Sequence, residues 1–247
     1  MQHQPHEPSL QGLLESAGAF LAAATLPAGP FDPAGAWKQN YAVWMKDRQE
    51  GWTGALALQR GPRQDGEFDL QVDWRVRQST KVVHHVQAAV VCQADELATP
   101  RSWKSQSRIL QPSGQAIDDL TVAQEAVSKD GVVELSDGRR LFADRPLKAW
   151  TSNWSLLEAV QRIAPGRIKP LSFSMLEFLD VRKDGQCLSY LGQADVDFGA
   201  RKAHLSGYQH LGAGVLPWEY WLDEHRRLVV VRSGLVGYLA VEDGPKS

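Results

Sequence analysis

The sequence predicts a mainly β protein in which a long antiparallel meander curves around one internal helix. Apolar and polar residues alternate over many short segments, tight-turn residues separate these segments, and one segment inside the meander has a helical apolar stripe. A period of two places alternate side chains on opposite faces of a strand. We therefore expect a single β half-barrel domain over residues 37–247, preceded by a helix and a Gly/Pro-rich link over residues 1–36.

The N-terminal helix is expected within residues 10–28, where apolar residues recur at the three- and four-residue spacing of an amphipathic helix. This segment also resembles the apolar part of a signal peptide. However, Glu7 and Glu15 stand where a signal peptide needs positive charge, and the first basic residue is Lys38. We interpret the segment as a docked helix, and the compartment of the protein stays open.

The clearest strand is Phe68–Gln78, because five apolar residues alternate with five polar ones there. Gly- and Asp-rich turns, including two Asp-Gly steps, separate it and its neighbours into a meander. The other expected strands are Tyr41–Met45, Thr53–Gln59, Lys81–Gln93, Ser102–Leu110, Asp118–Ala126, Val132–Leu135, Phe173–Arg182, Cys187–Tyr190, Ala194–Phe198 and Lys202–His210. A turn is expected at Lys183-Asp184-Gly185.

The end of the chain, Leu216–Val241, reads as three short antiparallel strands. Its first strand alternates Trp218, Tyr220 and Leu222 with polar or aromatic neighbours, and a Leu-Val-Val-Val strand follows a polar turn. The internal helix is expected over about 155–164, because Ser155 and Glu158 have the spacing of a capping box and an apolar stripe follows. That stripe requires the sheet as its packing partner.

Composition excludes several classes of function. The net charge of −2 gives no electrostatic reason to expect nucleic acid as a partner, and no apolar run is long enough to span a membrane. Cys92 and Cys187 are far apart in the sequence, and we interpret them as unpaired core residues, with a disulfide as the alternative. Nine tryptophans suit a wide β core or the lining of an apolar cavity. The oligomeric state stays open.

No nucleophile elbow, phosphate-binding loop, dinucleotide motif or Cys-x-x-Cys pair is present, and we predict neither a cofactor nor a metal site. His84 and His85 are adjacent in a strand and must face opposite sides. Scattered residues that are candidates for acid/base chemistry remain, and they are His84, His204, His210, Asp195 and Asp197. Asp195 and Asp197 share one strand face, which we interpret as a solvated outer face.

Three segments carry a resemblance to a known group of proteins. The segments are NYAVWMKDRQEGWTGALALQR, WSLLEAVQRI and LPWEYWLDEHRRLVVVRSGLVGYLA. They resemble uncharacterised bacterial envelope proteins related in fold to the periplasmic lipoprotein carriers. The resemblance implies an open antiparallel half-barrel in the cell envelope, which shelters an apolar ligand such as a lipid or an acyl chain.

Three hypotheses for function follow. The first is a non-catalytic binding or carrier protein whose apolar cavity is lined by Trp74, Trp218 and Tyr220; whether the internal helix leaves this cavity open or fills it is left undecided. The second is a hydrolase or isomerase assembled from the scattered histidines and aspartates. The third is a structural subunit that uses the aromatic C-terminal strands as an interface.

Overall fold

The computed structural model describes residues 25–45, 54–164, 167, 169–198, 201–234 and 236–242. Up to residue 24, the expected N-terminal helix lies outside the described residues. The strands are β1 Trp37–Met45, β2 Gly54–Arg60, β3 Glu67–Arg77, β4 Val83–Gln93, β5 Pro100–Leu110, β6 Ala116–Lys129, β7 Val132–Leu135, β8 Arg140–Leu141, β9 Trp150–Ser152, β10 Leu171–Glu177, β11 Val181–Phe198, β12 Arg201–Leu211, β13 Trp218–Leu222, β14 Leu228–Ser233 and β15 Val236–Val241.

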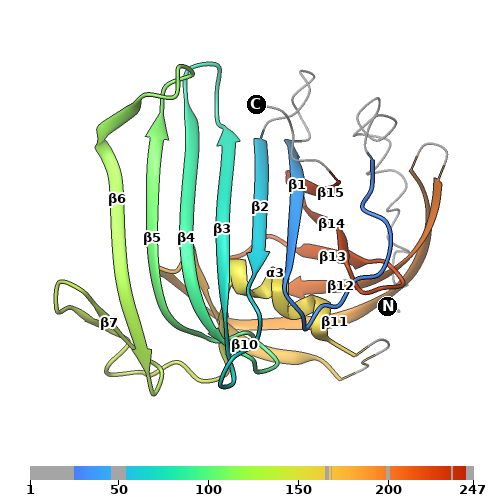
Figure 1. Ribbon diagram of the computed structural model, residues 1–247. Helices are drawn as coiled ribbons and strands as arrows, with labels where there is room; N and C mark the ends of the chain where they lie inside the picture. Colours follow the sequence, from blue (N-terminus) through green and yellow to red (C-terminus); the bar gives the residue numbers. More distant parts are fainter. Residues whose placement is uncertain are drawn as a thin grey trace, which may run out of the picture.

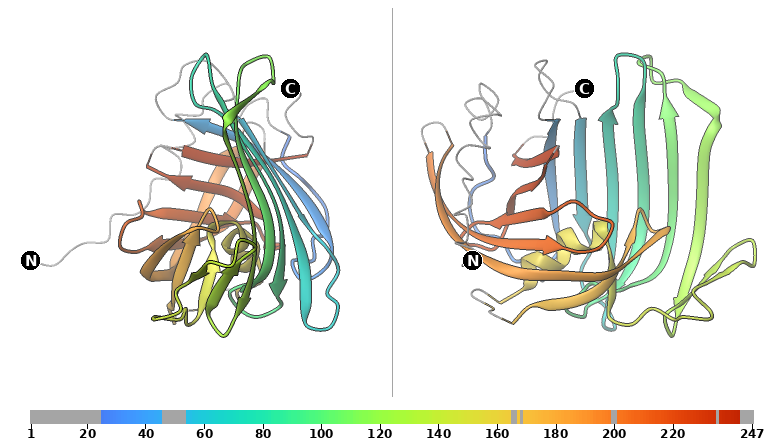
Figure 2. Two further views of the ribbon diagram at one scale, coloured as in Figure 1. Left: turned by 90° about the vertical axis from the view of Figure 1, so that its left-hand side faces the viewer. Right: turned by 180° about the vertical axis from the view of Figure 1, so that it is seen from behind.

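In the described part of the chain, all fifteen strands belong to one sheet (Figure 1). Strands β1 to β8 are consecutive neighbours, and so are β9 to β15. The two halves join where β1 pairs with β15, and the sheet ends at the short edge strands β8 and β9. Figure 2 shows that the sheet curves and stays open, and in Figure 1 the second half crosses behind the lower part of the first. The predicted curved antiparallel meander is confirmed.

Burial follows the predicted alternation most clearly in β3. From residue 68 to residue 77, the even-numbered side chains are apolar and buried, and the odd-numbered ones are polar and exposed. It pairs with β4 in continuous register, from Glu67 opposite Gln93 to Arg77 opposite Val83. We call the buried face, against which the helix packs, the inner face of the sheet, and the opposite one the outer face.

The internal helix, α3 (Asn153–Arg162), begins two residues earlier than expected. Its N-cap is Ser152, whose hydroxyl accepts a hydrogen bond from the backbone N–H of Ser155 at 3.0 Å. The capping box predicted from Ser155 and Glu158 is therefore wrong, because the cap lies three residues upstream. The apolar stripe packs into the main core as expected.

One side of α3 is polar although it is buried. Ser155, Glu158 and Gln161 recur at a spacing of three and have no exposed surface. The Oε1 of Glu158 accepts hydrogen bonds from the Nε of Arg60 on β2 at 2.8 Å and from the Nε of Arg162 at 2.7 Å. Arg60 also reaches the backbone carbonyls of Ala34, Gly35 and Gly61. This ion pair fixes the helix to the first half of the sheet.

Gln161 connects α3 to both halves of the sheet. Its side chain exchanges hydrogen bonds with Gln39 on β1 and accepts the backbone N–H of Leu228 on β14 at 3.0 Å. The phenol of Tyr41 donates to Gln39 at 2.7 Å, so the network is satisfied where it crosses the core. The helix therefore has a defined position against the sheet, set by polar contacts that sequence periodicity does not show.

The hairpin between β10 and β11 differs from the prediction. The chain turns at Phe178 and Leu179, whose φ angles are 52° and 63°, and runs straight through Lys183-Asp184-Gly185. Asp184 and Gly185 form a β-bulge, since Phe173 pairs with Gln186 while Met175 pairs with Lys183. The expected strands Cys187–Tyr190 and Ala194–Phe198 are parts of one strand, β11.

A second apolar cluster lies on the outer face of β1 and the C-terminal half, and it includes Trp44 and Trp221. Each ring packs onto a glycine of a neighbouring strand, because a Cβ at Gly237 would lie 2.1 Å from Trp44 and one at Gly207 would lie 2.6 Å from Trp221. Because glycine has no side chain, each indole ring can pack directly on the backbone of the neighbouring strand. The outer face is thus apolar there and polar over the first half of the sheet.

Candidate functional site

Two of the three predicted ligand-binding residues, Trp74 and Tyr220, are buried in the main core, and Trp218 is partly buried against it. The rings of Trp218 and Tyr238 are 6.1 Å apart. Burial raises the pKa of Tyr238 to about 12. Side chains of the protein itself therefore cover most of the surface of all three residues.

This aromatic group continues toward solvent through Phe178. The Phe178 ring lies 6.0 Å from that of Trp74 and 5.6 Å from that of Trp154 on α3. Its left-handed φ of 52° is uncommon for a bulky residue and costs energy. The amide of Phe178 donates to Asn153 Oδ1 at 2.7 Å, and buried Leu179 anchors the turn. These contacts hold Phe178, 43% exposed, at the boundary between core and solvent.

His84 supplies the polar group beside these rings. Its ring packs edge-on against Trp74 at 5.1 Å, and its Nε2 lies 2.8 Å from the Ser107 hydroxyl. Burial, with a smaller contribution from His85, lowers the pKa of His84. The imidazole is therefore neutral near pH 7 and suits hydrogen bonding rather than charge pairing. As predicted, His85 faces the other side, where its Nε2 lies 2.9 Å from Asp73.

Exposed apolar side chains lie on β6, beside Ser107, the residue that His84 contacts. Val122 pairs with Ser107, which pairs with Val86, so Val122 lies on the inner face. Leu120 precedes it by two residues, at a register shift between β5 and β6. Leu120 is 51% exposed and Val122 is 66% exposed. We call Leu120, Val122 and Phe178 the inner apolar strip. In Figure 1, α3 lies behind β1 to β3 and does not extend to β5 and β6.

The scattered acid/base candidates do not form one site. His204 Nδ1 lies 2.8 Å from Asp195 Oδ1, but the two are cross-strand neighbours and largely exposed. Asp197 is exposed on the same face, which agrees with a solvated surface. His210 is buried beside Gln186 and Phe173, and burial lowers its pKa to about 4. No group of three or more potential metal ligands gathers within the described residues.

The C-terminal aromatic residues are mostly buried inside the fold rather than exposed. Tyr220, Trp221 and Tyr238 are buried, and Trp218 is partly buried.

Cys92 and Cys187 are both free, as interpreted from the sequence. Burial raises the pKa of Cys92 to about 12, so its thiol is unreactive in the folded state.

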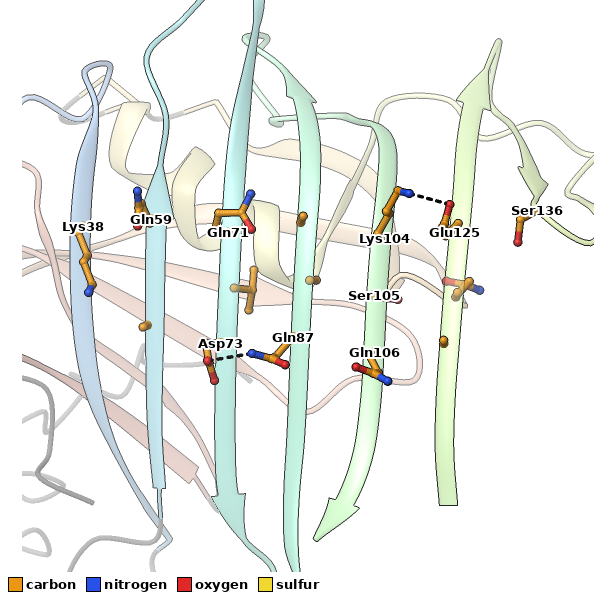
Figure 3. Close-up of a pocket in the computed structure, with 16 residues that line it drawn as sticks. Lys38, Gln59, Gln71, Asp73, Gln87, Lys104, Ser105, Gln106, Glu125 and Ser136 are labelled. Atoms are coloured by element: carbon orange, nitrogen blue, oxygen red, sulfur yellow. Dashed lines mark hydrogen bonds and ion pairs between the residues drawn. The ribbon is translucent and has the colours of Figure 1, made fainter. Parts of the chain in front are cut away.

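An open depression of about 980 Å³ lies across the first half of the sheet (Figure 3). Its exposed lining comes from the outer face, and α3 lies behind the sheet in this view. Besides Ser105 and Gln124, its polar lining residues come from six strands and the residue after β7, and they are Lys38, Gln59, Gln71, Asp73, Gln87, Lys104, Gln106, Glu125 and Ser136. We call this surface the outer trough. Sequence reasoning missed it, because its residues become neighbours only through strand register.

Two limits on function come from the described residues. Neither Trp74, Trp218 nor Tyr220 lines the outer trough or the depression that adjoins it. In the part of the chain that the structure describes, no helix combines the length and the apolarity needed to cross a membrane.

No protein-family model and no curated protein matches the sequence. Among solved structures, the chain is similar to a β-barrel-like protein of the domain of unknown function DUF1849 from Brucella abortus. The identity is 14% and the TM-score 0.55, over 84% of this chain and 96% of that one. A DUF1089 family protein from Pseudomonas aeruginosa aligns at 13% identity and a TM-score of 0.37, over 83% and 94% of the two chains. The first similarity shows a β-barrel-like fold alone, and the lipoprotein-carrier resemblance stays a prediction.

Proposed function

We propose that this protein is a non-catalytic binding or carrier protein for an apolar ligand such as a lipid or an acyl chain. The ligand lies on the inner face, along the inner apolar strip and against Trp74. Trp218 and Tyr220 form the wall behind this contact. The observation that carries the proposal is the exposure of Leu120, Val122 and Phe178 on or beside a face whose other half is the core.

Exposed apolar residues grouped beside an aromatic cluster often mark a binding surface. Burying about 200 Å² of apolar surface under an acyl chain contributes ~5 kcal/mol before the costs of association. The strained turn at Phe178 supports the same role, since strain of this kind is retained where the surrounding contacts position a side chain. The neutral His84 and the Ser107 hydroxyl offer hydrogen bonds to an uncharged part of the ligand.

The first test is native mass spectrometry of protein purified without detergent from its host, before and after solvent extraction. We expect an adduct of lipid mass that extraction releases. A fluorescent acyl probe, 11-(dansylamino)undecanoic acid, then measures affinity for the extracted protein. Bare chain mass together with no probe binding would refute the proposal.

Strand β6 supplies a matched pair of variants. Val122→Asn changes the inner face at a side chain that is 66% exposed, and Val127→Asn changes the outer face at one that is 58% exposed. Loss of one valine contact weakens probe binding by about tenfold in Val122→Asn. Val127→Asn binds as the parent does. Equal affinities in the two variants would contradict binding on the inner face.

A further inference from the structure

The outer trough consists of two adjacent rows of side chains that run across the strands. In the first row, cross-strand pairing aligns Lys38, Gln59, Gln71, Ala89, Lys104 and Glu125. In the second row it aligns Asn40, Ala57, Asp73, Gln87, Gln106 and Ala123. Neighbouring residues within a row stand about 4.8 Å apart, which is the spacing between strands. The trough is therefore a regular array of polar groups on a rigid sheet.

Alanines make the surface hollow. Ala57, Ala89 and Ala123 each stand in a row among longer side chains, and all three line the depression. An adjoining depression of about 1010 Å³ shares Ala89, Lys104, Glu125 and Ser136 with the trough and continues toward β7 and β8. The combined shape is long and shallow, which suits an extended ligand rather than a compact one.

Part of the array has unused hydrogen-bonding capacity. Among the described residues, the side chains of Gln59 and Gln71 have no hydrogen-bond partner and Lys38 has no carboxylate partner. Each glutamine amide offers two donors and an acceptor. By contrast, Lys104 is paired with Glu125 at 3.0 Å, and Gln87 donates to Asp73 at 3.3 Å. The free amides therefore lie at the β2–β3 end of the trough.

The charges of the lining nearly cancel. The two depressions together contain four cationic side chains, which are Lys38, Lys104, Lys129 and Arg140. They contain five anionic ones, which are Asp69, Asp73, Glu125, Asp130 and Glu134. A highly charged ligand therefore gains no net attraction. The backbone groups below are paired within the sheet, so a peptide strand finds no free edge here.

We infer that the outer trough binds an extended, uncharged, polyhydroxyl ligand, namely an oligosaccharide. Hydroxyl groups both donate and accept hydrogen bonds, and so match the free amides of Gln59 and Gln71. None of the described residues that line the trough is aromatic, so binding depends on hydrogen bonds and is weak, about 1 mM. The inference concerns the face opposite the inner apolar strip and is independent of the proposed function.

The test is an NMR titration of the ¹⁵N-labelled protein with cellotetraose, maltotetraose and chitotetraose. We expect at least one of them to shift the side-chain amide resonances of Gln59 and Gln71. Filling the floor with Ala57→Leu weakens that binding at least about tenfold, because the added side chain occupies the hollow. Ala55→Leu, on the same strand and face but outside the trough, leaves it unchanged. Thermal unfolding of both variants confirms that they fold.

Three outcomes overturn the inference. The first is the absence of shifts up to about 10 mM of every tetrasaccharide. The second is binding that Ala57→Leu leaves intact while the variant is folded. The third is a response only to an uncharged peptide such as acetyl-Gly-Ser-Gly-Ser-amide, which places a different class of ligand in the trough. None of these outcomes affects the acyl-probe experiment on the inner face.

Discussion

Removal of the Glu158 carboxylate is expected to be the most damaging single change in the internal helix. The side chains of Arg60 and Glu158 are 1% and 0% exposed, and their Nε and Oε1 atoms are 2.8 Å apart. Both Arg60 and Arg162 donate to the same carboxylate oxygen, while Oε2 has no hydrogen-bond partner among the described residues. Glu158→Ala leaves the guanidinium of Arg60 buried without a counter-charge.

The magnitude follows from burial. Removing one partner of a fully buried ion pair costs about 3–5 kcal/mol of unfolding free energy, because the remaining charge keeps its desolvation penalty. For a domain of this size each kcal/mol corresponds to about 2–4 °C, so the melting temperature falls by roughly 6–20 °C. The double variant Arg60→Met, Glu158→Leu removes both charges and is expected to be more stable than either single variant.

Urea unfolding followed by tryptophan fluorescence measures these free energies. The control is Glu125→Ala, which breaks the exposed Lys104–Glu125 pair and costs less than about 1 kcal/mol. A loss below about 1 kcal/mol in Glu158→Ala would refute the reasoning, and so would a double variant as unstable as the worse single one.

Two further predictions concern buried residues. His210 has a pKa of about 4 in the fold against 6.5 when unfolded, so its contribution to stability is complete above pH 6.5 and is lost as the pH falls toward 4. Between about pH 7 and about pH 4.5, the urea midpoint should fall less in His210→Gln than in the parent. In the parent, protonation of the unfolded histidine costs about 3 kcal/mol of unfolding free energy in full. An equal fall of the midpoint in both proteins would contradict this prediction. Gly237→Ala places a Cβ 2.1 Å from the Trp44 ring, whereas Gly234→Ala meets nothing within 4 Å. Thermal unfolding should show a loss of about 1–3 kcal/mol for the first and almost none for the second.

Most strands were predictable from the sequence, because alternation is a local property that burial on one face imposes directly. In β3 the burial of every second residue follows the apolar pattern. The internal helix was also predictable as an element, but its start was not. Ser152 and Ser155 both precede an apolar run, and only the backbone geometry shows that Ser152 is the cap. Glu158 was misassigned because its partner, Arg60, is 98 residues away in the sequence.

The turn before β11 shows where local signals fail. Asp184-Gly185 has the composition of a hairpin turn, yet it forms a bulge, and the chain turns at Phe178-Leu179 without a glycine. Packing of Phe178 against Trp74 and Trp154, together with the burial of Leu179, outweighs the local backbone preference. This choice also brings Phe178 to the edge of the candidate ligand site.

By itself, then, the sequence determined a curved antiparallel meander with one internal helix, because the two- and 3.6-residue periods of apolar residues can be recognised within short segments. It also predicted that Trp74, Trp218 and Tyr220 line a cavity for an apolar ligand, and this stays a prediction. Only the tertiary structure decided that Val122 is exposed on the inner face and that burial lowers the pKa of His84 and His210. It also decided that six strands align two rows of mostly polar side chains on the outer face. Each of these properties depends on which strands pair and in which register, and pairing joins residues far apart in the chain.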